Sequence, residues 1–292
     1  MKKILELLTL SLGVSTILVG CGSDEASASG VDSETEITVV SREDGSGTRG
    51  AFIEIFGVQV KDDEGNKVDE TYDEAVIANK TSIVMTNVAN DPNAIGYISL
   101  GSLNDTVKAL QIEGVEASIE NIQNGSYEVF REFNITYTDD LSELGQDFIS
   151  FMLSAQGQEV ISDSYIGVEG EAYDYETTLI EDKLIVAGSS SVSPAMEKLK
   201  EAYELLNTNA TIEIQTTDST SGVNATIDGT CDIGMASRSL KDEELEQVNG
   251  EVIALDGLAV VVNNDNVHVD SLSKEQVRSI FTGETTIWEN LE

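Results

Sequence analysis

Three segments of the sequence combine glycine with several hydroxyl side chains in a way that suits anion binding. They are residues 42–48 (Arg-Glu-Asp-Gly-Ser-Gly-Thr), 188–194 (Gly-Ser-Ser-Ser-Val-Ser-Pro) and 218–223 (Asp-Ser-Thr-Ser-Gly-Val). Glycine lets an anion approach the backbone, and Ser and Thr hydroxyls add hydrogen-bond donors around it. Arg42 adds a full positive charge and a planar fork that matches two oxygens of an oxyanion. Together the segments predict a site for a tetrahedral oxyanion.

Each of these segments lies between a predicted strand and a predicted helix. The strands are Ile37–Ser41, Leu184–Ala187 and Thr211–Gln215. A helix N-terminus has unpaired N–H groups and a partial positive charge, both of which favour an anion. One hydroxyl-bearing helix start is only an ordinary N-cap. Three in one chain favour a shared ligand.

Strands and helices alternate along most of the remaining chain. Further extended segments are predicted at Ile95–Leu100, Asp232–Ala236 and Ile253–Asn263. Helices are predicted at Ala51–Phe56, Leu141–Leu153, Gly157–Ser162, from Ser193, at Val223–Ile227, and at Val277–Phe281 behind a capping box from Ser273 to Gln276. This alternation predicts an α/β fold with largely parallel sheets, in which ligands bind at the carboxyl ends of strands.

The N-terminal residues predict export and lipid anchoring. Lys2 and Lys3 precede a mostly apolar stretch from Ile4 to Gly20 that is too short for a membrane span. Leu18-Val19-Gly20-Cys21 is typical of a lipobox, whose cysteine is acylated. We therefore assign residues 1–21 to a lipoprotein signal peptide with its lipobox. Residues 22–36 are rich in Ser, Ala, Gly, Asp and Glu, which predicts a disordered tether.

The composition excludes some partners. The chain has 54 acidic and 16 basic residues and a net charge of −38. Such a field disfavours nucleic acid. It also opposes the capture of an anion, but surface charge is screened beyond ~8–10 Å at ordinary salt, whereas an anion site acts through donors at close range. Cys231 is the only other cysteine besides Cys21 and is expected to be an inert core residue.

The motifs resemble those of the PstS-type phosphate-binding protein, the solute receptor of high-affinity phosphate ABC importers. Ser41–Arg49 is similar to the most diagnostic motif of that family. Further similar blocks are Gly188–Pro194, Asp218–Gly222, Gly234–Arg238, Ala94–Tyr97, and Ile280–Gly283 with Trp288. The resemblance extends over residues 37–292. It implies a periplasmic-binding-protein-like α/β fold with two lobes, a hinge and a central anion cleft.

The resemblance also implies roles for individual residues. The implied phosphate-binding residues are Arg42, Ser46, Gly47, Thr48, Ser191, Val192, Ser219 and Ser237. Asp44 is expected to orient Arg42. Arg238 stands where some members have an aspartate that accepts the proton of hydrogen phosphate. Either Arg238 points away into a salt bridge, or another carboxylate such as Asp218 accepts that proton.

The order of the blocks differs from that of the family. There the Gly-Ser-Ser-Ser block comes near the start, and the Phe-Thr-Gly…Trp block leads directly into Ser-Arg-Glu-Asp. A circular permutation explains this order, with the old termini joined near Leu179–Lys183. It predicts one lobe from residues 37–99 plus 263–292 and a continuous lobe from 100–262. Leu291 is then expected near the start of the Ile37 strand, with Trp288 packed on the same lobe. The alternative is a truncated tandem.

These features predict a receptor rather than an enzyme. The protein is expected to be a monomer, lipid-anchored on the extracytoplasmic face of the membrane, that passes phosphate to the membrane subunits of an ABC importer. No cofactor or metal is expected, because the sequence has no Gly-x-Ser-x-Gly elbow and no metal-ligand spacing. The only histidine, His268, is expected in a solvated loop. The alternatives are a phosphate-sensing or adhesive surface protein and, less favoured, a phosphoryl-transfer enzyme.

Overall fold

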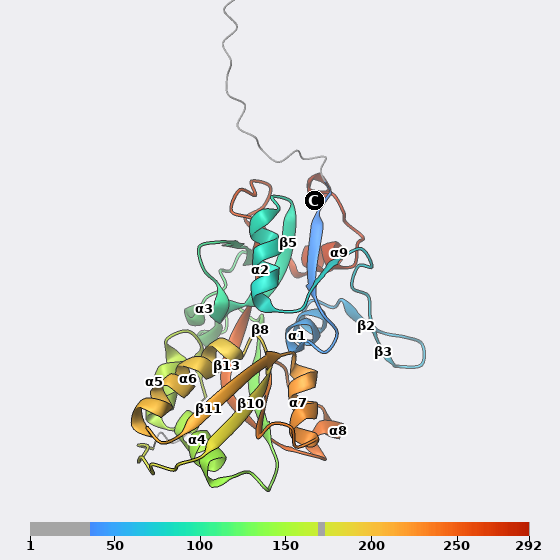
Figure 1. The fold of residues 1–292 in the computed structure, drawn as a ribbon. Helices are drawn as coiled ribbons and strands as arrows, with labels where there is room; N and C mark the ends of the chain where they lie inside the picture. The colour runs from blue at the N-terminus through green and yellow to red at the C-terminus, as the bar shows by residue number, and fades with distance from the viewer. Residues whose placement is uncertain (1–35, 169–172, 292) are drawn as a thin grey trace, which may run out of the picture. The chain divides into compact units, whose positions relative to one another are not determined.

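The structure is a computed structural model that describes residues 36–168 and 173–291. The predicted signal peptide, Cys21 and most of the predicted tether lie outside these residues. The last tether residue, Glu36, forms a β-bridge with Ile287, so this residue belongs to the fold and not to a disordered segment. The described chain has the predicted α/β architecture (Figure 1).

A mixed sheet runs through the molecule in the order β11-β10-β12-β8-β13-β5-β1-β4, with β6 and β9 also paired to β13. Its strands are β1 (Thr38–Arg42), β4 (Val76–Ala78), β5 (Ala94–Ser99), β6 (Lys108–Ala109), β8 (Phe130–Tyr137), β9 (Ile166–Gly167), β10 (Lys183–Ser189), β11 (Thr211–Thr217), β12 (Ile233–Ala236) and β13 (Asn249–Val262). The groups β4-β1-β5 and β11-β10-β12 are parallel, as predicted. The strands β8 and β13 are antiparallel to their neighbours, which the sequence did not predict.

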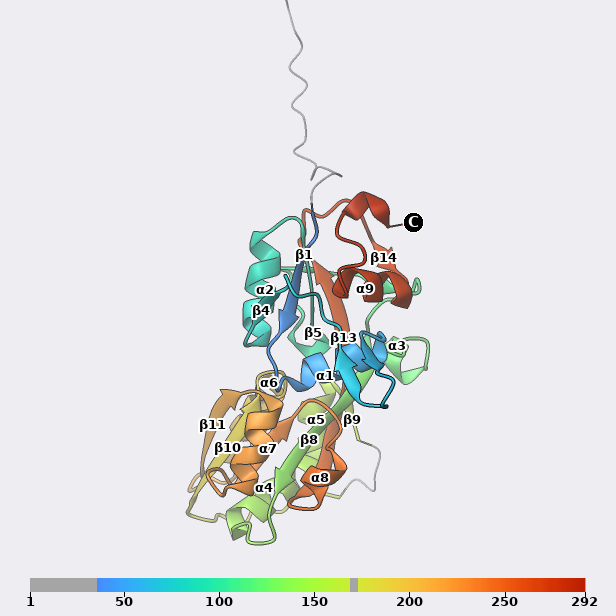
Figure 2. The ribbon, with the colours of Figure 1, turned by 90° about the vertical axis from the view of Figure 1, so that its right-hand side faces the viewer.

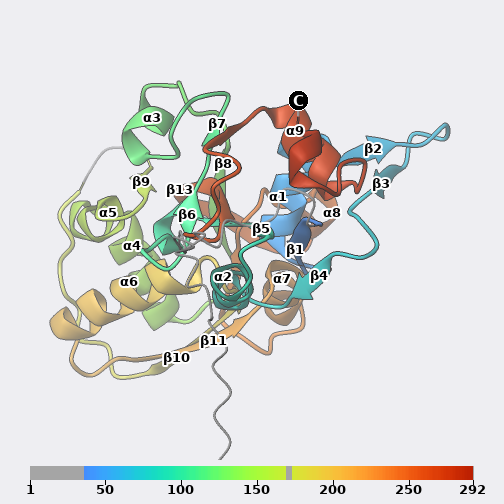
Figure 3. The same ribbon diagram turned by 90° about the horizontal axis from the view of Figure 1, so that it is seen from above.

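Six of the helices in the described residues were predicted, and those at Thr81–Asn90, Ile119–Gln123 and Asp242–Leu245 were not. The helices are α1 (Gly47–Ile55), α2 (Thr81–Asn90), α3 (Ile119–Gln123), α4 (Glu143–Leu153), α5 (Ala155–Ser162), α6 (Ser193–Leu206), α7 (Ser219–Ile227), α8 (Asp242–Leu245) and α9 (Lys274–Phe281), with 3-10 turns η1 (Leu100–Ser102) and η2 (Trp288–Asn290). The predicted capping box of α9 is confirmed, because Ser273 accepts from Gln276 N and Gln276 accepts from Ser273 N. Two short pairs complete the strands: β2 (Gln59–Lys61) with β3 (Lys67–Asp69), and β7 (Gln111–Ile112) with β14 (Ser271–Leu272). The β2–β3 hairpin projects from the rest of the described chain (Figure 3).

Two large hydrophobic cores divide most of the described residues, and a third, small cluster of Val223, Ala236 and Val248 is separate from them. One core draws its buried side chains from residues 37–129 and 258–288, and we call this part the first lobe. The other draws them from residues 133–254 and forms the second lobe. The predicted division had assigned residues 100–129 and 258–262 to the continuous lobe, whereas their buried side chains pack in the first. The reason is that Leu258–Val262 pairs with β5 of the first lobe.

The C-terminal segment lies against the start of β1. Ile37 N donates to Thr286 O at 2.7 Å, and Trp288, which is 3% exposed, packs in the core of the first lobe. Figure 2 shows α9 and the C-terminal end beside the beginning of β1. The predicted proximity of these two segments is therefore confirmed. Cys231 is buried, as expected. Within the described ranges, no helix is long and apolar enough to cross a membrane.

Candidate anion site between the lobes

Arg42, the last residue of β1, is buried between the two lobes and is 2% exposed. Its Nε and Nη2 atoms donate to the two carboxylate oxygens of Glu43 at 2.7 Å each. On the other side, Nη2 donates to Ser190 Oγ at 3.1 Å and Nη1 to Thr81 Oγ1 at 3.4 Å. Glu43 therefore fixes one edge of the guanidinium, and the other edge faces neutral hydroxyls.

Seven buried hydroxyl side chains lie next to Arg42, and we call them the hydroxyl cluster. They are Thr48, Thr81, Ser189, Ser190, Ser191, Ser219 and Ser237, each at most 7% exposed. Ser191 Oγ lies 2.7 Å from Thr48 Oγ1 and 3.0 Å from Thr81 Oγ1, and Ser189 Oγ donates to Ser237 Oγ at 2.9 Å. The threonines belong to the first lobe and the serines to the second. The cluster therefore exists only where the lobes meet.

Strand ends and helix starts position the cluster. Thr48 lies in the first turn of α1, Thr81 and Ser219 are the first residues of α2 and α7, and Ser191 precedes α6. Each of these helices follows a strand of a parallel group, so their N-termini meet at the carboxyl edges of the two groups. Unpaired N–H groups and helix dipoles there favour an anion.

Gly47 allows the two lobes to approach closely. A Cβ atom at this position would overlap Ser219 Oγ and lie 2.9 Å from Ser237 Oγ. Thr220 N also donates across the interface to Gly45 O at 3.1 Å. A side chain at position 47 would separate the start of α1 from the serines of the second lobe, so glycine is required for this packing.

The structure brings most of the predicted phosphate-binding residues together. Thr48, Ser191, Ser219 and Ser237 are cluster members beside Arg42, and Gly47 touches them. Two other predicted residues have local partners in this structure. Ser46 Oγ caps α1 by accepting from Arg49 N at 3.3 Å. Val192 N donates to Ser189 O at 3.1 Å.

Asp44 and Asp218, which were expected to support the anion site, have other partners in the structure. Asp44 does not contact Arg42, because its side chain is 98% exposed and pairs with Arg49 at 3.3 Å. The neighbouring Glu43 holds Arg42 instead. Asp218 Oδ1 caps α7 by accepting from Ser221 N at 2.9 Å.

Arg238 forms the salt bridge that the sequence left as one of two alternatives. Its Nη1 and Nη2 atoms donate to Glu244 at 2.8 and 2.7 Å. Burial raises the pKa of Glu244, but the hydrogen bonds from Arg238 and from Lys241 N, together with the positive charges of both residues, outweigh it and the pKa is lowered. Arg238 is therefore committed to Glu244 within the second lobe.

Four residues of the site were not singled out from the sequence. Ser189 and Ser190 lie in the glycine–serine segment, and Glu43 lies in the arginine motif, so each was within a recognised block. Thr81 was missed because β4, the short strand before it, was not predicted. A hydroxyl at a helix start behind a strand was the signal available for it.

The hydroxyl cluster fits binding better than catalysis. Across residues 36–168 and 173–291, no cluster hydroxyl is hydrogen-bonded to a carboxylate or a histidine that could activate it as a nucleophile. The same residues contain no group of three or more His, Cys, Asp or Glu side chains able to hold a metal. His268 is not in a solvated loop as expected, since its ring stacks on Trp288 and its Nε2 is buried.

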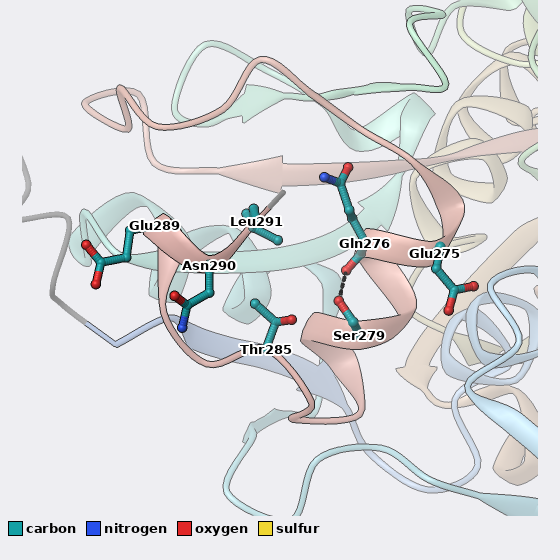
Figure 4. Close-up of a pocket in the computed structure, with 7 residues that line it drawn as sticks. All are labelled: Glu275, Gln276, Ser279, Thr285, Glu289, Asn290 and Leu291. Atoms are coloured by element: carbon teal, nitrogen blue, oxygen red, sulfur yellow. Dashed lines mark hydrogen bonds between the residues drawn. The ribbon is translucent and has the colours of Figure 1, made fainter.

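Two cavities help to delimit the site. One of about 340 Å³ borders the hydroxyl cluster and is lined by Thr81 and Ser190 together with Met85, Ser102 and Pro194. Another of about 350 Å³ lies between α9 and the C-terminal segment and contains no residue of the cluster (Figure 4). Of these two cavities, only the first borders the hydroxyl cluster.

Comparison with known proteins agrees with this geometry. The family described as PBP superfamily domain matches residues 24–156 and 169–291. The Phosphate-binding protein PstS 2 of Streptococcus agalactiae serotype V is 49% identical over 99% of this chain and 98% of its own. The protein of the same name from Streptococcus pneumoniae serotype 4 is 46% identical over 99% of this chain and 100% of its own.

A solved structure is similar over most of the chain. The crystal structure of a phosphate ABC transporter, phosphate-binding protein, from Streptococcus pneumoniae TIGR4 is 47% identical, with a TM-score of 0.69, and covers 88% of this chain and 100% of its own.

The fold and these matches define a solute-binding receptor of the PBP superfamily, and not an enzyme. Within that class, the chain belongs to the PstS family of phosphate-binding proteins of ABC transporters.

Proposed function

We propose that this protein binds inorganic phosphate between its lobes and delivers it to the membrane subunits of an ABC importer. The observation that carries the proposal is the buried Arg42 guanidinium, which turns one edge to Glu43 and the other to the hydroxyls of Thr81 and Ser190. The relatives are named for phosphate binding, and they align with this chain over its whole length.

Phosphate is expected to take the hydroxyl-facing edge of Arg42. An oxyanion there would replace the contacts to Ser190 and Thr81, while Glu43 keeps its two hydrogen bonds. The hydroxyls of Thr48, Ser191, Ser219 and Ser237 and the N–H groups of Gly47 and Thr48 would supply the other donors. The N–H groups of Ser46, Ser191 and Val192 already donate to Glu43 O, Ser189 Oγ and Ser189 O. Charge-assisted bonds to Arg42 add strength and fix the orientation of the anion.

Titration calorimetry on phosphate-stripped protein tests the binding. We expect one phosphate per chain with micromolar affinity or tighter, and much weaker heat with sulfate. No heat and no rise in melting temperature at millimolar phosphate would contradict the proposal. Because Arg238 is bonded to Glu244, the sulfate titration also tests whether selection against sulfate needs an aspartate at that position.

The receptor is proposed to act as a lipid-anchored monomer on the extracytoplasmic face of the membrane. The support is the lipobox at Cys21 and the polar segment that follows it. In a bacterial host, wild-type protein is expected in the membrane fraction and Cys21→Ala in the soluble fraction or the medium. Equal release of both would remove the anchor from the proposal, and size-exclusion chromatography with light scattering checks the monomer.

A further inference from the structure

The strands β8 and β13 connect the two lobes. A buried ion pair joins these two strands at the point where they pass from the core of one lobe to the core of the other. On β13, Ala254 packs in the second lobe and Leu258 in the first. On β8, Phe133 packs in the second lobe, whereas Val129, just before the strand, packs in the first. Arg131 and Asp256 lie between these positions and are partners in the β8–β13 register.

Asp256 of this ion pair also accepts hydrogen bonds from the first lobe. Arg131 Nη2 donates to Asp256 Oδ2 at 3.1 Å, while Ser99 Oγ and Gly101 N donate to Asp256 Oδ1 at 2.9 and 3.2 Å. Asp256 is 1% exposed and Arg131 6%. Asp256 thus ties the end of β5 and the turn η1 to the strands that lead into the second lobe.

Stability does not account for this pair. Burial raises the pKa of Asp256 to about 6 and lowers the pKa of Arg131 to about 10, so each charged form is disfavoured although each has its counter-ion. Tyr165 and Arg42 also act on the charge of Arg131, and burial raises the pKa of Tyr165 too. Buried ion pairs often contribute less stability than apolar side chains of similar volume, and one attested use is to specify a single arrangement.

A tyrosine of the second lobe rests on the same turn of the first lobe. Tyr165 belongs to the second core, and a Cβ atom at Gly101 would overlap its ring. The Tyr165 hydroxyl is buried and has no hydrogen-bond partner among the described residues. The ring therefore acts through its shape, and the absence of a side chain at position 101 determines how closely the lobes approach.

We infer that the contact between Tyr165 and Gly101, held in place by Asp256, sets the closure of the lobes and thereby the phosphate affinity from outside the anion site. This inference rests on the proposed function. The cluster contacts between Thr48 and Ser191 and between Arg42 and Ser190 join residues of different lobes, so they form only when the lobes are closed. A side chain that separates Tyr165 from position 101 separates these residues too, because packed lobes move as units.

The test is Gly101→Ala, with Gly250→Ala as a matched control. A Cβ atom at Gly250 would also overlap a side chain, that of Leu240, but both residues lie in the second lobe. Phosphate calorimetry is expected to show an affinity at least tenfold lower for Gly101→Ala and unchanged for Gly250→Ala. In small-angle X-ray scattering without phosphate, Gly101→Ala is expected to have a larger radius of gyration than the wild type and the control.

A rescue variant covers the case in which Gly101→Ala merely folds poorly. Tyr165→Leu removes the ring that the new methyl group meets and loses no hydrogen bond of the Tyr165 hydroxyl in the described structure. Combined with Gly101→Ala, it is expected to restore the affinity and the radius of gyration. Wild-type affinity in Gly101→Ala, equal losses in Gly101→Ala and Gly250→Ala, or failure of the rescue would overturn the inference. A wild type that binds no phosphate would instead refute the proposed function, and the scattering comparison would still test the closure.

Discussion

Two arginines among the described residues are buried with carboxylate partners, and their surroundings differ. Around Arg42 each guanidinium nitrogen has a partner, two of the partners are neutral hydroxyls, and the Glu43 side chain is 18% exposed. Around Arg131 the partner Asp256 is 1% exposed, and Nε and Nη1 have no partner among the described residues. Neutral hydroxyls can give way to an oxyanion, whereas a buried counter-ion cannot leave without a large cost. One arginine is therefore suited to exchange partners and the other to hold the strands.

Arg131→Leu is expected to have the largest effect on stability. It leaves the Asp256 carboxylate buried without its counter-ion, which should lower the free energy of unfolding by about 3–5 kcal/mol at neutral pH. Denaturant unfolding measures this loss. The exposed pair of Lys183 and Glu213 is the control, since Lys183→Met should cost at most about 1 kcal/mol. Comparable losses in both variants would show that burial of the first pair is unimportant.

Arg42→Ala is expected to have the largest effect on phosphate binding. A hydrogen bond from a charged donor contributes about 1.5–3 kcal/mol and one from a neutral donor about 0.5–1.5 kcal/mol. Calorimetry should therefore show a greater loss for Arg42→Ala than for Ser191→Ala, with partial recovery in Arg42→Lys, whose ammonium group lacks the fork. If Arg42→Ala and Ser191→Ala lose affinity equally, Arg42 does not supply the positive charge that binds phosphate.

The pH dependence of stability is expected to distinguish Asp256 from its amide. The pKa of Asp256 is about 6 in the folded protein, above the ordinary value of 3.8, because of burial. A raised pKa means that the folded state binds the proton more tightly than the unfolded state. Protonation of Asp256 therefore stabilises the folded protein, and this stabilisation is fully present below about pH 4 and is lost as the pH rises through 6. As the pH falls from 7 to 4, the unfolding free energy of the wild type should therefore rise relative to Asp256→Asn by at least about 1 kcal/mol. A constant difference between the two would contradict the raised pKa.

Glu43→Gln is expected to have a smaller effect that depends on phosphate. Without ligand, the variant leaves Arg42 with a neutral partner and should lose about 1 kcal/mol or more of unfolding free energy. Phosphate should offset part of this loss, since it supplies a new counter-charge, so the melting temperature should rise more on adding phosphate than it does for the wild type. Asp44→Asn is the control, because Asp44 is 98% exposed and does not touch Arg42. If Glu43→Gln and Asp44→Asn show the same stability and the same rise in melting temperature with phosphate, Glu43 does not orient Arg42.

Most of the fold was predictable because its signals are local. The parallel strands β1, β10 and β11 and the helices that follow them have β-branched runs, helix caps and apolar faces within a few residues. Strands β8 and β13 were harder, because their pairing joins residues more than one hundred positions apart and depends on both cores. The division between the lobes was displaced for the same reason.

Site residues that lie in recognisable motifs could be predicted from the sequence. Site residues whose position depends on tertiary packing could not. Arg42, Thr48, Ser191 and Ser219 lie in the three glycine and hydroxyl segments, whereas Ser237 was implied only by the family resemblance. The structure brings all five together. Nothing in the sequence tells whether Glu43 or Asp44 faces Arg42, because the direction of each side chain depends on the turn before α1. Thr81, the first residue of α2, follows a strand of three residues, which is too short to show a pattern.

The altered block order remains a prediction that the structure supports. The segment that ends the chain packs against the strand that begins the fold, which a permutation requires. The PstS 2 proteins align with this chain over nearly the whole length of both, so they share its order of blocks.

A crystal structure of the protein grown with phosphate tests the central claim most directly. The account predicts one phosphate between the lobes, with two oxygens on the Nη1 and Nη2 atoms of Arg42, Glu43 still on the opposite edge, and hydroxyls of Thr48, Ser191 and Ser237 turned to the anion. Phosphate bound elsewhere, or at Arg42 with Glu43 displaced by the anion, would contradict it.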